Sequence, residues 1–396
     1  MTYLCSFLAV ATTNLVATAL SDADASASAS RLEEVFGTAT RLALLCGIVS
    51  AALQMGLGRS VLARYTAARS AAVVGPAYTY VRVRALGAPA ALLARVSTAT
   101  CLASKDPQTP LLAVAASGAL NLILDLILVS VFGLGIGGAA WATVVSEVAC
   151  AAFVLRAVRA KLGLRRRASD ETDLNGWKRR LLNGRSLLPA RAEVAIYAAF
   201  ARPLLVTLAG KIATYSALAH VATCVSVVGT AAHRVLMCVY WFTWPFAEVC
   251  SQVGQAFLPG MRSVRPLLRK LLSFGAAVGI ACGCMAGGVL AWAPQLFTSD
   301  VAVSAAIQSL APLVTACIAT LALMCAMEGA LLATRQLGFL STFYAVNAVS
   351  MVAAFAVVER LGLGLHAAWG CMLVFQLVRL AAFGVRLRLG PGQVLN

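Results

Sequence analysis

Hydrophobic residues are gathered along the chain in long continuous runs, most of them longer than about twenty residues. An α-helix needs about 20 apolar residues to cross the hydrocarbon core of a bilayer, whereas the strands of a membrane β-barrel alternate between apolar and polar positions. The pattern therefore predicts an all-α polytopic membrane protein. Eleven helical spans are expected, at residues 3–21, 34–57, 75–104, 109–133, 136–160, 190–226, 229–258, 268–292, 299–333, 337–358 and 364–388.

One long polar segment interrupts these runs near the middle of the chain. It extends from about 156 to 191 and contains eleven Lys or Arg residues against three acids. Five spans precede it and six follow it. We therefore expect an N-terminal lobe at 1–161, a basic linker at 162–189 and a C-terminal lobe at 190–396.

The composition agrees with a membrane protein and excludes a soluble enzyme. Hydrophobic residues make up 61% of the chain and charged residues 12%, whereas soluble domains average about 45–50% and roughly 25%. A net charge of +17 would suggest a nucleic-acid partner in a soluble protein, but Lys and Arg also gather in the cytoplasmic loops of membrane proteins. With the linker on the cytoplasm or stroma side, 20 basic residues lie on that side and 4 on the other. We predict this orientation and no nucleic-acid partner.

The two lobes share a repeated pattern. Leu-Ala-Ser-Lys-Asp at 102–106 and Gly-Leu-Gly-Ile at 133–136 reappear as Leu-Ala-Thr-Arg-Gln at 332–336 and Gly-Leu-Gly-Leu at 362–365, at offsets of 230 and 229 residues. This spacing predicts two parallel repeats, as in the halves of some secondary transporters, and hence two six-helix bundles. The span at 190–226 has no counterpart in the first lobe, so we expect that a first helix is missing. A truncated, non-transporting product is therefore an alternative.

The sequence lacks the spacings of common cofactor sites. Its twelve cysteines include no CxxC pair, and it has three histidines, so no metal site is expected. The phosphate-binding pattern GxxxxGK[ST] is absent, so any driving energy must come from an ion or solute gradient. We predict no cofactor other than a coupling ion, H⁺ or Na⁺.

Asp125 is the first candidate functional residue, because a charged group inside a membrane span is costly and marks functional sites. It lies mid-span, one helical turn after Asn121, so the carboxylate and the amide share a helix face. Together they are suited to hold a proton or a sodium ion. Polar packing between helices is the alternative.

Glu248 is the second candidate, in the middle of the span at 229–258. Pro245 precedes it and favours a kink in that helix. Gln252 and Gln255 follow at spacings of four and three residues, which predicts one polar stripe suited to a water-filled cavity. Here too, helix packing is the alternative.

Two further acids lie within spans. Glu328 is a lesser functional candidate, on a helix interrupted by Pro312. Glu147 is interpreted as a structural residue that pairs with Arg95 or Arg41.

Several segments, taken in order, resemble the multidrug and toxic compound extrusion (MATE) transporters. They cover nearly the whole chain and lie at 80–90, 105–110, 121–125, 133–146, 231–235 and 251–259. Two others, Glu328-Gly-Ala-Leu-Leu-Ala and Phe375-Gln-Leu-Val-Arg379, resemble the plastid-envelope branch of plant and algal members.

This resemblance implies alternating access and export of small organic solutes in exchange for H⁺ or Na⁺. It matches Asn121 and Asp125 to an ion site on the family's fifth helix and Glu248 to an acidic position on its eighth. The sequence departs from the family in two ways. The family's first helix, which in many bacterial members supplies an acidic partner to this ion site, is absent. Arg234 stands where many relatives have glutamine.

We therefore predict a monomeric antiporter in a lipid bilayer and no enzymatic activity. The resemblance implies that this bilayer is the plastid envelope. The predicted ion-coupling and substrate-binding residues are Asp125, Asn121, Glu248, Glu328, Gln252 and Gln255. The alternative is a flippase for lipid-linked precursors, from the same superfamily, which would need a cationic cavity. The residues that would supply one are Arg95, Arg202, Lys211 and Arg234.

Overall fold

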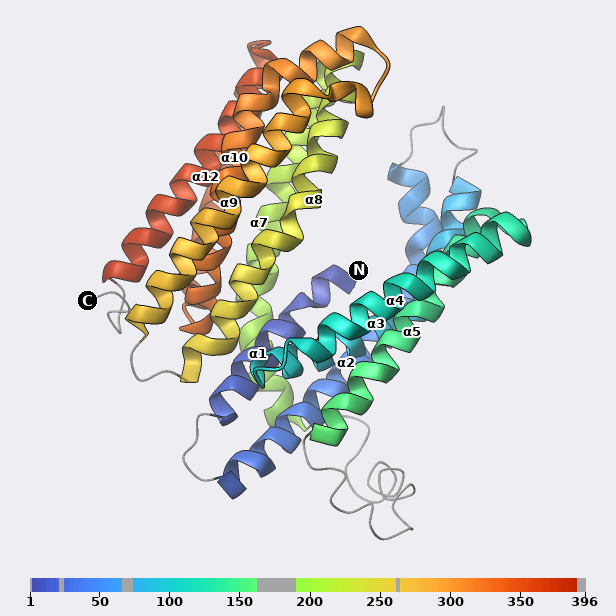
Figure 1. Ribbon diagram of the computed structural model, residues 1–396, viewed down its shortest axis with the longest axis vertical. Helices are drawn as coiled ribbons and strands as arrows, with labels where there is room; N and C mark the ends of the chain where they lie inside the picture. Colours follow the sequence, from blue (N-terminus) through green and yellow to red (C-terminus); the bar gives the residue numbers. More distant parts are fainter. Residues whose placement is uncertain (1, 21–24, 66–73, 162–189, 261–263, 390–396) are drawn as a thin grey trace. The chain divides into compact units, whose positions relative to one another are not determined.

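The computed structural model describes residues 2–20, 25–65, 74–161, 190–260 and 264–389 (Figure 1). Every predicted span corresponds to one α-helix, and the described residues contain no strand, so the all-α prediction is confirmed. The predicted linker at 162–189 lies outside the described residues. The helices are α1 (Phe7–Leu20), α2 (Ala25–Tyr65), α3 (Val74–Ala103), α4 (Gln108–Asp125), α5 (Gly135–Lys161), α7 (Arg191–Val225), α8 (Val227–Phe257), α9 (Arg265–Trp292), α10 (Val301–Ala333), α11 (Leu337–Arg360) and α12 (Gly364–Leu389).

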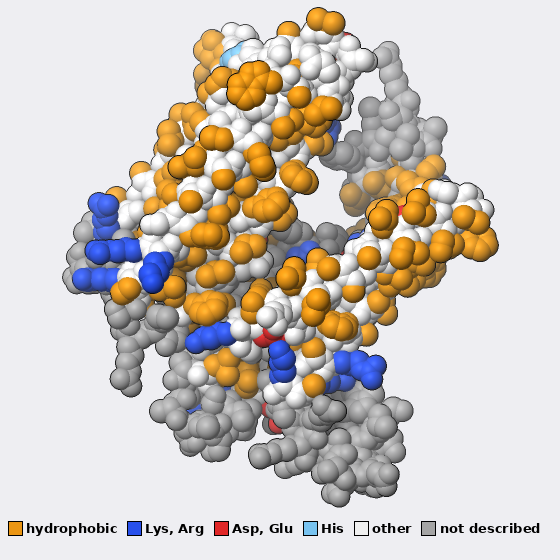
Figure 2. All heavy atoms as spheres, viewed as in Figure 1, with side chains coloured by type: hydrophobic (Ala, Val, Ile, Leu, Met, Phe, Trp, Pro, Cys, Tyr) orange, Lys and Arg blue, Asp and Glu red, His pale blue; other side chains and the backbone are white. Residues whose placement is uncertain are grey.

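The helices have the length and composition of membrane spans. Within the described ranges, nine segments are long and apolar enough to cross a bilayer. Hydrophobic side chains cover the visible lengths of the helices, and Lys and Arg side chains gather near helix ends (Figure 2). This distribution is expected for helices whose sides face lipid and whose ends face water.

The chain forms two compact units, Met1–Ala201 (unit 1) and Arg202–Asn396 (unit 2). The division falls within α7 rather than at its beginning. In unit 1, α3 packs between α2 and α5, and α4 packs on α5. In unit 2, α10 is the central helix and contacts α8, α9 and α12 (Figure 1).

The predicted repeat is present in the backbone of both units. Lys105, after α3, and Arg335, after α10, have φ angles of 60° and 55° and are the only non-glycine residues with positive φ in the described part of the chain. In both turns the amide of the following residue donates to the carbonyl five residues earlier, at 2.9 Å. This is a Schellman C-cap, whose left-handed residue is usually glycine. The two units therefore share an unusual turn at equivalent positions.

A second pair of turns repeats in the same way, before α5 and before α12. All four glycines in these turns have positive φ, which L side chains rarely adopt. They are Gly133 (65°), Gly135 (54°), Gly362 (63°) and Gly364 (76°). The sequence repeat thus reflects a structural requirement and not chance similarity of apolar segments.

Glycines also bring α9 and α10 of unit 2 into close contact. Gly275, Gly279, Gly283 and Gly287 lie one turn apart along α9 and all face α10. A Cβ atom on Gly279 would lie 2.2 Å from the carbonyl oxygen of Ala319. Small residues on one face allow such backbone approach in membranes.

Candidate functional site

In unit 1, Asp125 and Asn121 lie together at the end of α4, beside Thr143 of α5. With its amide oriented to satisfy both neighbours, Asn121 donates to Oδ2 of Asp125 at 3.2 Å and accepts from the backbone amide of Thr143 at 3.1 Å. The other carboxylate oxygen, Oδ1, is buried and has no hydrogen-bond partner among the described residues. A buried acceptor of this kind is rare, because leaving it unpaired costs about 1–3 kcal/mol or more for a charged group.

The backbone changes its helical type directly after Asp125. Residues Leu126–Val131 form a π-helical segment, a feature that is rare and occurs often at functional sites. The segment LILVSV contains neither Gly nor Pro, so its sequence gives no signal for this wider turn. The turn places Asp125 at a boundary between two helical geometries.

A second polar group in unit 1 involves Glu147 of α5, whose partner is neither Arg95 nor Arg41. Glu147 accepts two hydrogen bonds from Arg84 of α3, at 2.7 and 2.9 Å. That pairing prediction is therefore wrong. Arg41 instead pairs with Glu193 at 2.9 Å.

The Arg84–Glu147 pair is partly accessible, with side-chain exposures of 26% and 28%. It lines a cavity of about 210 Å³. The remaining lining residues are Gln54, Tyr80, Val81, Ala88 and Ala91. This cavity combines a bidentate ion pair with both polar and small apolar side chains, and no spacing along the sequence predicted it.

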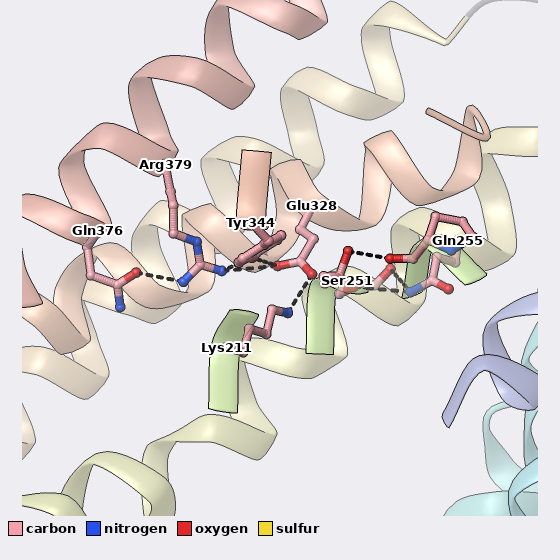
Figure 3. Close-up of polar contacts among 9 residues, drawn as sticks. Lys211, Ser251, Gln255, Glu328, Tyr344, Gln376 and Arg379 are labelled. Atoms are coloured by element: carbon pink, nitrogen blue, oxygen red, sulfur yellow. Dashed lines mark hydrogen bonds and ion pairs between the residues drawn. The ribbon is translucent and has the colours of Figure 1, made fainter. Parts of the chain in front are cut away.

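In unit 2, Glu328 of α10 lies at the centre of a buried ionic network (Figure 3). Its Oε1 accepts from Nζ of Lys211 (α7) at 2.6 Å, and its Oε2 accepts from Nη2 of Arg379 (α12) at 3.1 Å. The hydroxyl of Tyr344 (α11) also donates to Oε2, at 2.8 Å. Four helices thus contribute one side chain each to the network.

The network continues from the guanidinium of Arg379 through the neutral side chains of Gln376, Tyr240 and Tyr215. Nη1 of Arg379 donates to Oε1 of Gln376 at 3.1 Å, and Nε2 of Gln376 donates to the Tyr240 hydroxyl at 2.8 Å. That hydroxyl lies 3.2 Å from the hydroxyl of Tyr215. These contacts join side chains of α7, α8, α10 and α12 inside unit 2.

The network carries one excess positive charge, because Lys211 and Arg379 face the single carboxylate of Glu328. Glu248, on α8, interacts electrostatically with both Lys211 and Glu328. Its side chain is half-buried and makes no hydrogen bond within the described part of the chain. An ionised Glu248 would bring the net charge of the group to zero.

The predicted stripe of Glu248, Gln252 and Gln255 divides in the structure. Gln252 is exposed, whereas Gln255 is 4% exposed and donates to Oγ of Ser251 at 3.1 Å. The Ser251–Gln255 contact lies beside the Glu328 network (Figure 3). The three side chains therefore have different surroundings, and Gln255 contacts Ser251 on its own helix.

Sequence reasoning missed three members of the network as site residues, namely Lys211, Arg379 and Tyr344. Lys211 appeared only as a cation for the flippase alternative, and here it is engaged by Glu328. Arg379 lies within a predicted span, nine residues before its end. A basic residue at that depth is the signal that could have identified it.

Comparisons with known proteins agree with this architecture. The chain is 30% identical over 408 residues to Protein DETOXIFICATION 47, chloroplastic, of Arabidopsis thaliana, covering 100% of this chain and 70% of that protein. It is 46% identical over 80 residues to Protein DETOXIFICATION 44, chloroplastic, covering 20% and 15%. No protein-family model matches the chain.

Two solved transporter structures share the fold. One is a MOP superfamily transporter from Pyrococcus furiosus, with a TM-score of 0.77 and 18% identity, covering 99% of this chain and 85% of that one. The other is the Vibrio cholerae MATE transporter VcmN in its bent form, with a TM-score of 0.76 and 16% identity, covering 98% and 86%.

Proposed function

The chain belongs to the multidrug and toxic compound extrusion (MATE) family of multi-pass membrane transporters, and from this premise we propose that it exports small organic solutes in exchange for H⁺ or Na⁺. Each unit supplies one acidic site to this exchange. Asp125 with Asn121 is the site of unit 1, and Glu248 beside the Glu328 network is the site of unit 2.

The observation that carries the proposal is the buried, unpaired Oδ1 of Asp125. In a membrane-spanning helix an ionised carboxylate needs a proton or a cation when water is excluded. Asn121 occupies Oδ2 and leaves Oδ1 for that proton or cation. A site that is satisfied by an ion in one state and hydrated in another is what coupled exchange requires.

In unit 2 the two candidate acids have different roles in the proposal. Glu328 is already bound by two cations and a tyrosine hydroxyl, so it positions the network. Glu248 has no such partners, and it is the group that exchanges a proton. Gln252, which is exposed one turn further along α8, is available to contact a solute, and Gln255 supports the helix.

The names of two relatives support a location in the plastid envelope, since DETOXIFICATION 47 and 44 are both called chloroplastic. The basic helix ends of the chain would then face the stroma. The protein is proposed to act as a monomer, because each unit contains its own acidic site.

Transport by purified protein in liposomes tests the proposal. Accumulation of ethidium and of benzoate, as probes of organic cations and anions, is measured under an imposed pH or Na⁺ gradient. We expect Asp125→Asn to abolish accumulation driven by the gradient. Asp106→Asn is the matched control, because Asp106 lies in the loop between α3 and α4 and pairs with Lys161. Accumulation at the wild-type level in the Asp125 variant would remove this carboxylate from the mechanism.

A further inference from the structure

His220, Cys224 and Glu359 form a group at one end of unit 2, away from the Glu328 network. His220 and Cys224 lie one turn apart near the carboxyl end of α7, and Glu359 is next to last in α11. All three side chains are exposed. The predicted topology places both helix ends on the side of the membrane opposite the basic linker.

The three donor atoms converge on one point. Nε2 of His220 lies 3.6 Å from Oε2 of Glu359 and 3.7 Å from Sγ of Cys224. The three atoms all lie within 4.8 Å of one another. Ligand bonds of about 2.0 Å to nitrogen or oxygen and about 2.3 Å to sulfur put the donors on a tetrahedral zinc ion about 3.3–3.6 Å apart. The two shorter separations are therefore close to those that a shared ion imposes.

Direct hydrogen bonding accounts for this arrangement poorly. One ring nitrogen of His220 faces both the sulfur and the carboxylate oxygen, and a single N–H group can point at only one of them. The 3.6 Å separation from the carboxylate also exceeds the ordinary range of about 2.7–3.2 Å for an N–H···O bond. A cation between the three atoms would satisfy all of them together.

The helices that carry the three donors, α7 and α11, approach each other closely. Gly210 of α7 lies against the backbone of α11, where a Cβ atom would be 2.6 Å from the carbonyl oxygen of Tyr344. His220 and Cys224 lie on one face of α7 because they are four residues apart. This approach joins the two helices at one level, and the carboxylate of Glu359 reaches the face of α7 that carries His220 and Cys224.

We propose that His220, Cys224 and Glu359 bind one zinc ion that links the end of α7 to the end of α11. An imidazole, a thiolate and a carboxylate are ligands that Zn²⁺ accepts, and water completes a tetrahedral set. The thiolate and the carboxylate together neutralise the charge of the ion. Sequence spacing gave no sign of this site, because Glu359 lies more than a hundred residues beyond Cys224.

Cobalt substitution tests the site without reference to transport. The protein is purified in detergent through a cleavable tag that contains no histidine, stripped with a chelator and titrated with Co²⁺. We expect tetrahedral cobalt bands with a sulfur-to-cobalt charge-transfer band, saturating at one ion per chain and displaced by Zn²⁺. Cys224→Ser should lose the charge-transfer band, and Glu359→Gln should require more Co²⁺ to saturate.

Cys238→Ser is the matched control, because Cys238 is also exposed but lies on α8. It should keep the cobalt spectrum of the wild type. Zn²⁺ should also raise the apparent Tm of the wild type and of this control, but not that of Cys224→Ser. Absence of the charge-transfer band in the wild type, or its persistence in Cys224→Ser, overturns the proposal.

Discussion

Replacing Glu328 by glutamine removes the acid that pairs directly with both Lys211 and Arg379. The substitution keeps the size of the side chain but leaves two buried cations facing each other without a counter-charge. Arg379 is 1% exposed and the Lys211 side chain 16%, so water cannot screen them well. Breaking a buried ion pair by removing one partner costs about 3–5 kcal/mol.

Lys211→Met should be milder, although it breaks the same 2.6 Å contact. Glu328 keeps the hydrogen bonds from Arg379 and Tyr344, and the network changes from a charge of +1 to neutrality. The loss is then one hydrogen bond to a charged group, about 1.5–3 kcal/mol. Adding Lys211→Met to Glu328→Gln should restore part of the stability, because one of the two uncompensated charges disappears.

Thermal unfolding of the detergent-purified protein, followed by size-exclusion chromatography after heating, measures these differences. A unit of this size loses roughly 2–4 °C of Tm per kcal/mol. Glu328→Gln should therefore lower the apparent Tm by about 6–20 °C and Lys211→Met by about 3–12 °C. Equal losses for the two single variants, or a double variant less stable than Glu328→Gln alone, would refute the charge-balance argument.

Two further predictions concern packing and pH. Gly279→Ala places a methyl group against the carbonyl oxygen of Ala319 and should destabilise unit 2 by about 1–3 kcal/mol, whereas Gly370→Ala, which meets nothing within 4 Å, should leave the apparent Tm unchanged or higher. Burial raises the pKa of Asp106, but hydrogen bonds from Lys161 and Thr109 outweigh the effect of burial and hold this pKa below its usual value. Asp106 therefore stabilises unit 1 above its unfolded pKa, near 3.9, and this contribution is lost as the pH falls through the lower folded value. Asp106→Asn should flatten the acid side of a plot of apparent Tm against pH, and an unchanged acid slope would contradict this.

Helical periodicity was sufficient to predict features that lie within one segment. Each hydrophobic run became a helix, because nothing but a helix satisfies the backbone of so long an apolar segment in lipid. Asn121 and Asp125 were placed together correctly, since they lie one turn apart. The repeated turns at Lys105 and Arg335 were also visible, because the same backbone geometry selected similar residues twice.

The ionic contacts between helices could not be predicted in this way. Glu328 meets partners from α7, α11 and α12, and no spacing along the chain encodes which helix faces are opposed. Glu147 illustrates the same limit, because Arg95 and Arg41 were the expected partners and packing of α3 on α5 brings Arg84 to it instead. Gln255 was predicted to share a polar stripe with Glu248 and Gln252, but it is buried beside Ser251, because tertiary structure decides whether a helix face meets water or another helix.

The glycine contact between α9 and α10 has a mechanical consequence. At Gly275, Gly279 and Gly283 the main chain of α9 lies directly against the backbone of α10, so sliding or tilting of one helix against the other meets a steric clash. We therefore expect the two helices to move together as one rigid body. Any bending that accompanies passage of a solute must be absorbed elsewhere in unit 2, and α8 is suited to it, since Pro245 interrupts its hydrogen bonds close to Glu248.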